Sequence, residues 1–373
     1  MVLSVVFYLT VMALVLTAAY FVNGSVHNKG YRESNAQKTA EKPRQELLNI
    51  VLLWGIFLVL FAVSAFRIGI GNDYWAYRNN FLALAGGKTK VSYELGFKAL
   101  VLVVQHLFGL DNYRVTFAVM AFFTCGFFVK GIYDTADWFV MSLFLFLSNG
   151  FYLMSFSNVR YYFAFAVCLY AMKFVFQRKY ISFILWICFA ALFHKTILIA
   201  IPAYLIAWFL RWNKKTIWLI PAGSLLLILG KPMIRWVIFR FYPFYEGSAF
   251  DTGDVSYMNI LKCAAVLVFG LLFYKESIRG NQKAEMLFNL NLFALLLYSF
   301  GSYVPELTRI CYYLVLGQIF LLPMILQKIP QKLVKNFCLW GVVAAYCCYF
   351  LIFLWKGAGA DVLILPYLTW IFV

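Results

Sequence analysis

Ionisable side chains are scarce in this sequence, and several of them gather in one short stretch. The segment FRIGIGNDYWAYRNNF, residues 66–81, places Asp73 between Arg67 and Arg78 and close to Tyr77. A carboxylate can orient a hydroxyl group or accept its proton, and an arginine can hold an anion through two parallel N–H bonds. The local alternative is that Asp73 caps the turn after GIGN or pairs with a neighbouring arginine. Tyr77 either stacks on a sugar ring or anchors the chain at the membrane interface.

Glu94 and Arg160 supply a second carboxylate and a second guanidinium at the ends of apolar segments. Glu94, in VSYELGF, either serves a site or favours a helix N-terminus. Arg160 follows Asn158 at the start of the apolar run SFSNVRYYFAFAVCLYAMKFVFQ. An arginine in that place either reaches to lipid phosphates or binds a diphosphate, because its planar fork matches two anionic oxygens.

His194 is distinguished by the lengths of the apolar segments around it. Ile181–Phe193 has about 13 residues, roughly 20 Å of helix, and Thr196–Leu210 is no longer. Neither crosses a hydrocarbon core of about 30 Å, so FHKT is predicted to be the apex of a hairpin roughly 10 Å below the outer membrane plane. Poor hydration there would keep the imidazole neutral and able to accept a proton. The alternative is a histidine bonded to a backbone carbonyl, with Lys195 snorkelling.

Two further charged stretches complete the set of candidates. Glu306 and Arg309, in SYVPELTRICYYL, form either a local ion pair or a second phosphate clamp. The stretch KPMIRWVIFRFYPFYEGSAFDTGD, which includes Arg240, indicates an amphipathic helix followed by an acidic loop, either a membrane anchor or a lid over a lipid-linked substrate. The carboxylates are scattered, and no His has another His or a Cys at ligand spacing. The sequence therefore predicts no metal and no other cofactor.

The composition places these charges in a membrane. Hydrophobic residues make up 64% of the 373 residues and charged residues 13%, and the mean hydropathy is +0.81. Apolar runs such as Val51–Phe66 and Asn336–Trp355 are long enough to cross the hydrocarbon core as helices. The chain is predicted to be an all-α polytopic membrane protein with one integral membrane domain, residues 1–373.

The net charge of +17 reports topology, since many Lys and Arg residues lie between apolar runs. The positive-inside rule places residues 23–46 in the cytoplasm, and residues 67–95 and 231–256 outside, the last with its amphipathic helix. This arrangement needs about 12 spans (roughly 11 to 14) with both termini outside, provided that Phe97–Gly109 does not cross. If Phe97–Gly109 does cross, an N-inside arrangement with an extra span follows. In the first arrangement the candidate residues all face the outer side.

A series of motifs resembles the EpsG family of Wzy-like bacterial exopolysaccharide polymerases. The motifs are an Arg followed by GIGNDYWAY, then YELGF, NVRYYFAFAVCLYA, RKYISFILWICFAALFHKTILIAIPAYLI, LTRICYYL and a late LPYLTWIF. Each motif is a few polar residues in an apolar background, and their shared order carries the resemblance. The sequence departs from the family pattern at Asn72 and Tyr161, and neither departure removes an ionisable group.

The resemblance implies a metal-independent glycosyltransferase on the outer face of the bacterial cytoplasmic membrane. The enzyme would join oligosaccharide repeat units carried on undecaprenyl diphosphate, moving the growing chain to a hydroxyl of the next unit, in exopolysaccharide, capsule or O-antigen synthesis. Its fold would be GT-C-like, similar to the O-antigen ligases, with an outward-facing cavity that holds a His and several Arg. Its partners would be the lipid-linked donor and acceptor, membrane lipids, and chain-length regulator and flippase proteins, and not nucleic acid.

The resemblance and the charge pattern together assign the candidate residues. The candidate catalytic residues are His194, Asp73 and Glu94. The candidate diphosphate- and substrate-binding residues are Arg67, Arg160, Arg309, Tyr77, Arg78, Asn158, Arg240 and Glu306.

Two other classes of membrane protein compete with this interpretation. A membrane O-acyltransferase that modifies a polysaccharide would also place a His within a helical bundle, but its site would open toward a cytoplasmic acyl donor. A flippase or exporter of lipid-linked sugars would distribute cationic residues through the membrane depth or show a two-fold repeat. Here the outer cationic residues gather near one face, which favours the polymerase.

Cysteine substitutions at Ser34 and Ser248, on a background without native Cys, test the predicted topology. We expect an impermeant thiol reagent added to intact cells to label position 248 and not position 34, because the positive-inside rule places the two on opposite sides of the membrane. Labelling at position 34 but not at position 248 would overturn the orientation.

Overall fold

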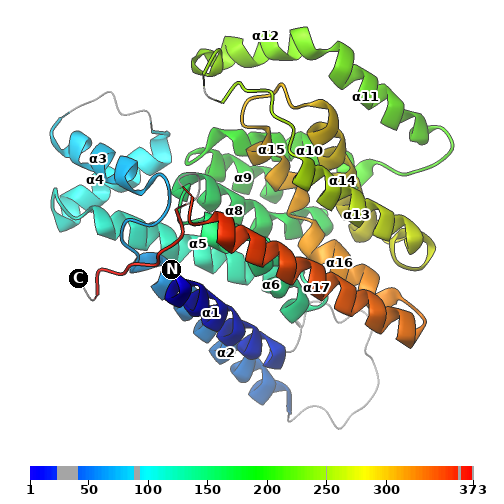
Figure 1. The fold of residues 1–373 in the computed structure, drawn as a ribbon, viewed down its shortest axis with the longest axis horizontal. Coiled ribbons are helices and arrows are strands. Elements are labelled where there is room, and N and C mark those ends of the chain that lie inside the picture. Colours follow the sequence, from blue (N-terminus) through cyan, green and yellow to red (C-terminus); the bar gives the residue numbers. More distant parts are fainter. Residues whose placement is uncertain (23–40, 88–92, 249, 360–362, 372–373) are drawn as a thin grey trace. The chain divides into compact units, whose positions relative to one another are not determined.

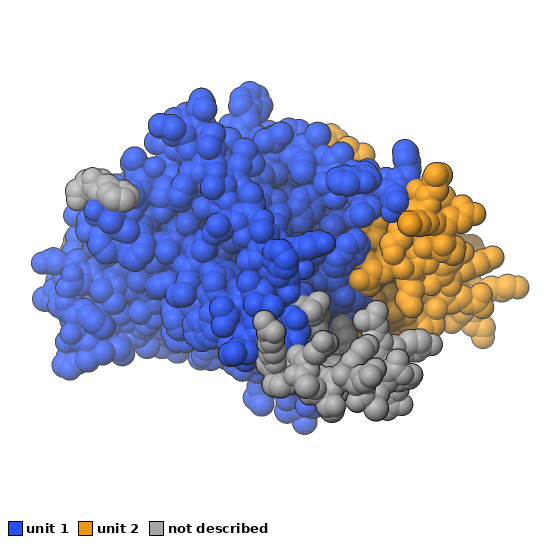
Figure 2. All heavy atoms as spheres, turned by 90° about the horizontal axis from the view of Figure 1, so that it is seen from below, with its two compact units in different colours: residues 1–195, 336–373 blue, residues 196–335 orange. Residues whose placement is uncertain are grey.

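The protein is described by a computed structural model that covers residues 1–22, 41–87, 93–248, 250–359 and 363–371, with residues 41–44 given by their backbone alone. In this part of the chain every regular element is a helix, and the one extended pairing is an isolated antiparallel bridge between Arg67 and Thr369 (Figure 1). The predicted all-α class is confirmed. The chain forms two compact units, residues 1–195 with 336–373 and residues 196–335, coloured blue and orange in Figure 2.

The first unit is a bundle around a buried helix, α8. Its elements are α1 (Val2–Phe21), α2 (Glu41–Ala65), α3 (Tyr74–Ala85), α4 (Leu95–Phe108), α5 (Tyr113–Thr135), α6 (Phe139–Ser148), α7 (Phe151–Met154), α8 (Val159–Phe176), α9 (Tyr180–Ala191) and most of α17 (Lys332–Lys356). Small residues such as Ala164, Ala166 and Ala171 are fully buried on α8. They let neighbouring backbones approach closely, as is usual between helices in membranes.

The second unit is held together by buried amide side chains. Its elements are η2 (Lys195–Ile199), α10 (Ala200–Phe209), η3 (Thr216–Trp218), α11 (Leu219–Leu229), α12 (Lys231–Phe241), η4 (Pro243–Tyr245), α13 (Tyr257–Leu272), the π-helical turn η5 (Tyr274–Ile278), α14 (Gln282–Phe300), α15 (Leu307–Val315) and α16 (Gln318–Lys328). Gln318 donates to Asn291 at 2.6 Å, and Asn291 donates to the carbonyl of Cys263 at 3.0 Å. These bonds satisfy polar groups that would otherwise be costly in an apolar core.

Helix length and composition confirm a multi-pass membrane protein. Among the described residues, six helices are long and apolar enough to cross a membrane, or up to seven if α11 and α12, which meet at a bend of 65°, form one span. Five further apolar helices have 10–17 residues, including α4, α9 and α13. Helices of that length fall short of the roughly 20 residues that a crossing needs. The predicted count of about 12 spans therefore stays a prediction.

The C-terminal tail pairs with the loop at residues 66–73, and α1 bonds to the tail. Ile68 N–H donates to the carbonyl of Leu368 at 3.0 Å, and Trp370 N–H donates to the carbonyl of Phe66 at 3.1 Å. The Tyr8 hydroxyl, from α1, donates to the carbonyl of Ile364 at 2.8 Å. Both ends of the chain thus lie at the end of the bundle where α2 stops (Figure 1).

The loops predicted from charge contain helices. Helix α2 begins at Glu41, so residues 41–46 of the segment predicted as the cytoplasmic loop 23–46 are helical, and residues 23–40 lie outside the described residues. Helix α3 lies within the predicted outer loop 67–95, and α12 lies within 231–256. The membrane side of each loop stays a prediction.

Gly71 allows the loop at residues 66–73 to pack directly on the turn before α8. Its φ of +95° is in the region that favours glycine, and a Cβ there would lie 2.3 Å from the carbonyl oxygen of Phe156. The next residue, Asn72, donates its N–H to the hydroxyl of Ser157 at 3.0 Å. The loop can therefore lie this close to the head of α8 only with glycine at position 71.

Replacing Gly71 by alanine tests this packing. We expect Gly71→Ala to lower the free energy of unfolding by about 2 kcal/mol or more, because strain and a backbone clash add together. The measurement is thermal unfolding of the purified protein in detergent. Gly55→Ala, on α2 with nothing within 4 Å of the added Cβ, is the matched control. A Gly71→Ala variant as stable as this control would contradict the argument.

Candidate functional site

Three of the predicted residues, Glu94, Arg160 and His194, meet at one point in the first unit. One carboxylate oxygen of Glu94 accepts a short charge-assisted hydrogen bond from Nη1 of Arg160. The other carboxylate oxygen, Oε1, lies 3.7 Å from Nδ1 of His194. The side chains are only partly exposed, 16% for Glu94, 22% for Arg160 and 13% for His194. The carboxylate therefore lies between a cation and an imidazole in a shielded position.

Arg160 occupies the first turn of α8, and Tyr77 fixes its position. The helix begins at Val159, and the carbonyl of Asn158, the residue before it, accepts from the N–H of Tyr162 at 2.9 Å. The Tyr77 hydroxyl, from α3, accepts from Nε of Arg160 at 3.3 Å and lies 3.5 Å from its backbone nitrogen. Burial raises the pKa of the Tyr77 phenol, although Arg160 opposes the shift. Tyr77 therefore stays neutral and holds the guanidinium without adding a charge.

Aromatic rings surround the Arg160 guanidinium. Its central carbon lies 4.9 Å from the ring centre of Tyr93 and 5.8 Å from those of Tyr77 and Phe97. Cation–π contacts of this kind are each worth about 0.5–2 kcal/mol, depending on desolvation. The rings and Glu94 together keep a charged side chain in one orientation, and the side chain does not extend freely toward lipid headgroups.

A close backbone contact brings Glu94 to His194. Gly96, in the first turn of α4, donates its N–H to the carbonyl of Leu192, just past α9, at 2.8 Å. A Cβ at position 96 would lie 2.9 Å from both Cβ and the carbonyl oxygen of Leu192. The start of α4 can therefore lie against the end of α9 only with glycine at this position. Glu94 precedes α4 and His194 follows α9, so this contact sets their separation.

His194 lies where α9 stops, as its flanking lengths predicted. Helix α9 has 12 residues, about 18 Å, and ends at Ala191. The N–H of His194 bonds to the carbonyl of Ala190 at 3.1 Å, and a 3-10 helix begins at Lys195. The imidazole ring lies edge-on to Tyr161, with 5.3 Å between the ring centres. The backbone break presents the imidazole to the Glu94 carboxylate.

Arg67 does not join this cluster. Its residue is 3% exposed, and its guanidinium donates to the carbonyls of Ser64 and Phe156, the latter at 3.2 Å. The rings of Phe117 and Phe156 cover it at 5.2 and 5.0 Å. Burial lowers the pKa of the Arg67 guanidinium to about 10, which still leaves it charged at neutral pH. This geometry supports a structural role that ties α2 to the turn before α8, and the contact of Arg67 with phosphate stays a prediction.

Asp73 and Arg78 lie at the edge of the site, Asp73 directly before α3 and Arg78 within it. Asp73 is half-buried directly before α3, and its carbonyl accepts from Tyr77 N–H at 2.9 Å. Arg78 lies over the rings of Trp75 and Tyr113, at 5.8 and 5.5 Å. Asp73 therefore precedes the helix without a side-chain cap hydrogen bond, and Arg78 packs on aromatic rings.

The remaining candidates belong to the second unit. Oε2 of Glu306, a residue with left-handed backbone, lies 2.9 Å from Nε of Arg309, which is the local ion pair. Arg240 is exposed near the end of α12. These three residues lie in a different unit from Arg160.

Sequence reasoning missed a bidentate ion pair in the second unit. Arg235, on α12, donates to both carboxylate oxygens of Asp251 at 2.6 and 2.8 Å, and to the carbonyl of Tyr303 at 3.3 Å. The hydrogen bonds from Arg235 lower the pKa of the Asp251 carboxyl. The pair fastens the amphipathic helix to the loop after it and to the segment before α15. In the sequence, the basic helix followed directly by an acidic loop was the signal that could have indicated this pair.

The site residues that sequence reasoning missed are Tyr93, Gly96 and Phe97. All three lie within the motif YELGF, where only Glu94 carries an ionisable group of obvious function. Within the part of the chain that the structure describes, no group of three or more His, Cys, Asp or Glu residues could hold a metal ion.

Comparison with known proteins gives one match. The model of the EpsG family matches residues 50–369, which include every residue of the cluster described above. No curated protein and no solved structure matches the chain.

A double-mutant cycle tests the ion pair between Glu94 and Arg160. We expect Glu94→Gln and Arg160→Gln each to destabilise the protein, since each leaves a partly buried polar partner unmatched, and the double variant to recover part of the loss. The expected coupling is about 1–2 kcal/mol, below that of a fully buried pair because both side chains keep some exposure. Unfolding in detergent measures it. Strict additivity of the two losses would show that the pair contributes nothing.

Proposed function

The chain belongs to the EpsG family, and from this membership we propose that it is a membrane polysaccharide polymerase. In this proposal it joins oligosaccharide repeat units that are carried on undecaprenyl diphosphate, in exopolysaccharide, capsule or O-antigen synthesis. The observation that carries the proposal is the cluster of Glu94, Arg160 and His194, which places a base, its carboxylate partner and an anion-binding group together.

The reaction transfers a sugar from a diphosphate to a hydroxyl. The oxygen of the acceptor hydroxyl forms a bond to the anomeric carbon of the donor, and the bond from that carbon to the diphosphate oxygen breaks. The acceptor must lose a proton, and the leaving diphosphate gains negative charge. A site for this chemistry needs a proton acceptor and cationic donors that face the leaving group.

His194 is the group we assign to the acceptor proton. Its Nδ1 faces the carboxylate of Glu94 at 3.7 Å, a separation that can shorten when substrate binds. A carboxylate in that place orients the ring and stabilises the imidazolium that forms when Nε2 takes the proton. Glu94 is then a positioning residue and His194 the base, with Asp73 as the second candidate for the base.

Arg160 is the group we assign to the leaving diphosphate. Arginine has five N–H donors in a fixed fork, and two of those of Arg160 are used by Tyr77 and Glu94. The fixed guanidinium can therefore present its other donors without further ordering, which makes it a pre-organised electrostatic group. Arg309 and Arg67 stay further candidates for the diphosphate. Asn158, Tyr77, Arg78, Arg240 and Glu306 stay candidates for substrate contact. We propose that these cations replace a metal.

The remaining features of the proposal concern the membrane. We propose about 12 crossings and re-entrant helices in a GT-C-like arrangement, with the site open to the outer face of the bacterial cytoplasmic membrane. The short helices α4 and α9, of 14 and 12 residues, support re-entrant segments. Lipid-linked donor and acceptor are then the substrates, and chain-length regulator and flippase proteins the partners.

Reconstitution of the purified protein with an undecaprenyl-diphosphate-linked repeat unit tests the activity. We expect a ladder of polymer that survives EDTA. His194→Ala should lower the rate by about 10²–10⁴, the usual loss of a general base. Arg160→Lys should also be severe, because the ammonium keeps the charge but loses the bidentate fork.

The matched control is His106→Ala, an exposed histidine on α4, which should keep the activity. Near-normal polymer length from a well-folded His194→Gln variant would defeat the assignment of the base and transfer it to Asp73 or Glu94. A ladder that disappears with EDTA and returns with Mg²⁺ or Mn²⁺ would refute metal independence.

A further inference from the structure

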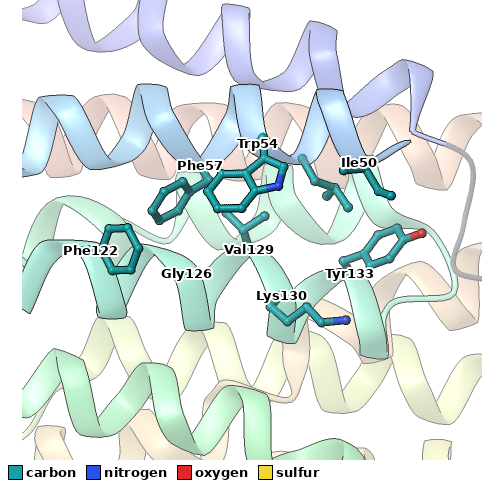
Figure 3. Close-up of a pocket in the computed structure, with 9 residues that line it drawn as sticks. Ile50, Trp54, Phe57, Phe122, Gly126, Val129, Lys130 and Tyr133 are labelled. Carbon is teal, nitrogen blue, oxygen red and sulfur yellow. The ribbon is translucent and has the colours of Figure 1, made fainter. Parts of the chain in front are cut away.

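An apolar groove runs between α2 and α5 in the first unit, and its lining includes none of Glu94, Arg160 and His194. Its volume is about 450 Å³, and its walls include Trp54 and Phe57 on α2 and Phe122 and Val129 on α5 (Figure 3). Phe57 and Val129 are 6% and 5% exposed and form its floor, whereas Trp54 is 56% exposed. The groove is therefore a recess between two helices, with an exposed aromatic rim.

The floor of the groove remains open because Gly126 has no side chain. A Cβ at this position would meet only the ring of Phe57, at 3.8 Å, so a larger side chain has room to enter the recess. Both lining helices are candidate membrane spans. From Phe122 to Tyr133 the groove extends for 11 residue steps, about 16 Å, which is close to half of a hydrocarbon core of about 30 Å.

The polar lining residues lie at one end of the groove. Lys130 and Tyr133 lie there, and Tyr133 Oη lies 3.5 Å from the amide of Asn49 (Figure 3). Lys130 has a 58% exposed side chain and shares the carboxylate of Asp134 with Lys173, whose Nζ lies 2.7 Å from Oδ2. Two ammonium groups thus share one carboxylate. An anion bound beside Lys130 would balance the second of these two positive charges.

We propose that this groove binds a membrane lipid that has an anionic phosphate headgroup. One hydrocarbon chain lies along Phe57, Val129 and Gly126, and the phosphate is held by the Lys130 ammonium and the Tyr133 hydroxyl. A lysine near a helix end reaches toward headgroups in this way. The length of the recess matches one leaflet, and its polar end matches an anion, so a zwitterionic or uncharged lipid fits less well. The proposal stands apart from the polymerase activity.

Native mass spectrometry of the full-length protein tests the proposal. The protein is purified in a mild detergent, and phosphatidylglycerol or phosphatidylcholine with the same acyl chains is added. We expect one phosphatidylglycerol to be retained at a concentration where phosphatidylcholine is not. Crosslinks from a phosphatidylglycerol with a photoreactive acyl chain should map to α2 and α5.

Two variants with matched controls locate the site. Gly126→Leu fills the recess while favouring the helix, and should lower phosphatidylglycerol retention by about tenfold, whereas Gly55→Leu on the open face of α2 should not. Lys130→Gln leaves Asp134 paired with Lys173 and should reduce retention about fivefold, whereas Lys179→Gln, an exposed lysine after α8, should not.

Three outcomes would overturn the proposal. Equal retention of the two lipids would show ordinary annular lipid. Unchanged retention and crosslinking in Gly126→Leu would place the lipid elsewhere. Loss of phosphatidylglycerol on addition of inorganic phosphate alone, with the acyl crosslinks absent from the start, would show a free-anion site without a bound chain.

Discussion

The hydrogen-bonded ion pair between Arg160 and Glu94 is the interaction around which the first unit is organised. A guanidinium at the head of a buried, apolar helix is costly unless it is matched, because neither lipid nor aromatic rings replace the water that it loses. Glu94 supplies the matching charge from a segment 66 positions earlier in the chain. The need to pair this charge therefore constrains where α4 begins, and with it the loop that precedes α4.

Close backbone contacts make the pairing possible. Gly71 lets the loop after α2 lie on the turn before α8, and Gly96 lets the start of α4 lie on the end of α9. Arg67 and the C-terminal tail reinforce the first contact through hydrogen bonds to backbone groups. Gly71 and Gly96 are therefore needed for steric reasons, since a side chain at either position would clash with a neighbouring backbone. The close contacts also fix the positions of the ionisable residues beside them.

The second unit solves the same problem, polar groups in an apolar setting, with neutral amides. Asn289, Asn291 and Gln318 are almost fully buried and each bonds to backbone or to another amide. The bidentate ion pair of Arg235 with Asp251 lies at the amphipathic helix α12 and not in the core. This charged pair therefore lies where one partner can reach a polar region. The interior of the unit uses neutral amide side chains, because an amide costs less free energy to desolvate than a charge.

The sequence by itself determined the all-helical membrane class and the family, and it singled out His194 as a candidate. These follow from hydropathy, from the order of short motifs and from segment lengths, all of which are properties of neighbouring residues. It also singled out Glu94 and Arg160, but left a local explanation open for each. Only the tertiary structure decided that these two meet, because their contact depends on helix packing across distant segments. It likewise showed Arg67 buried and bonded to backbone carbonyls, because burial and backbone partners have no local signal in the sequence. It also revealed the rings of Tyr93 and Phe97 beside the Arg160 guanidinium, where the sequence offered only two more aromatics among many.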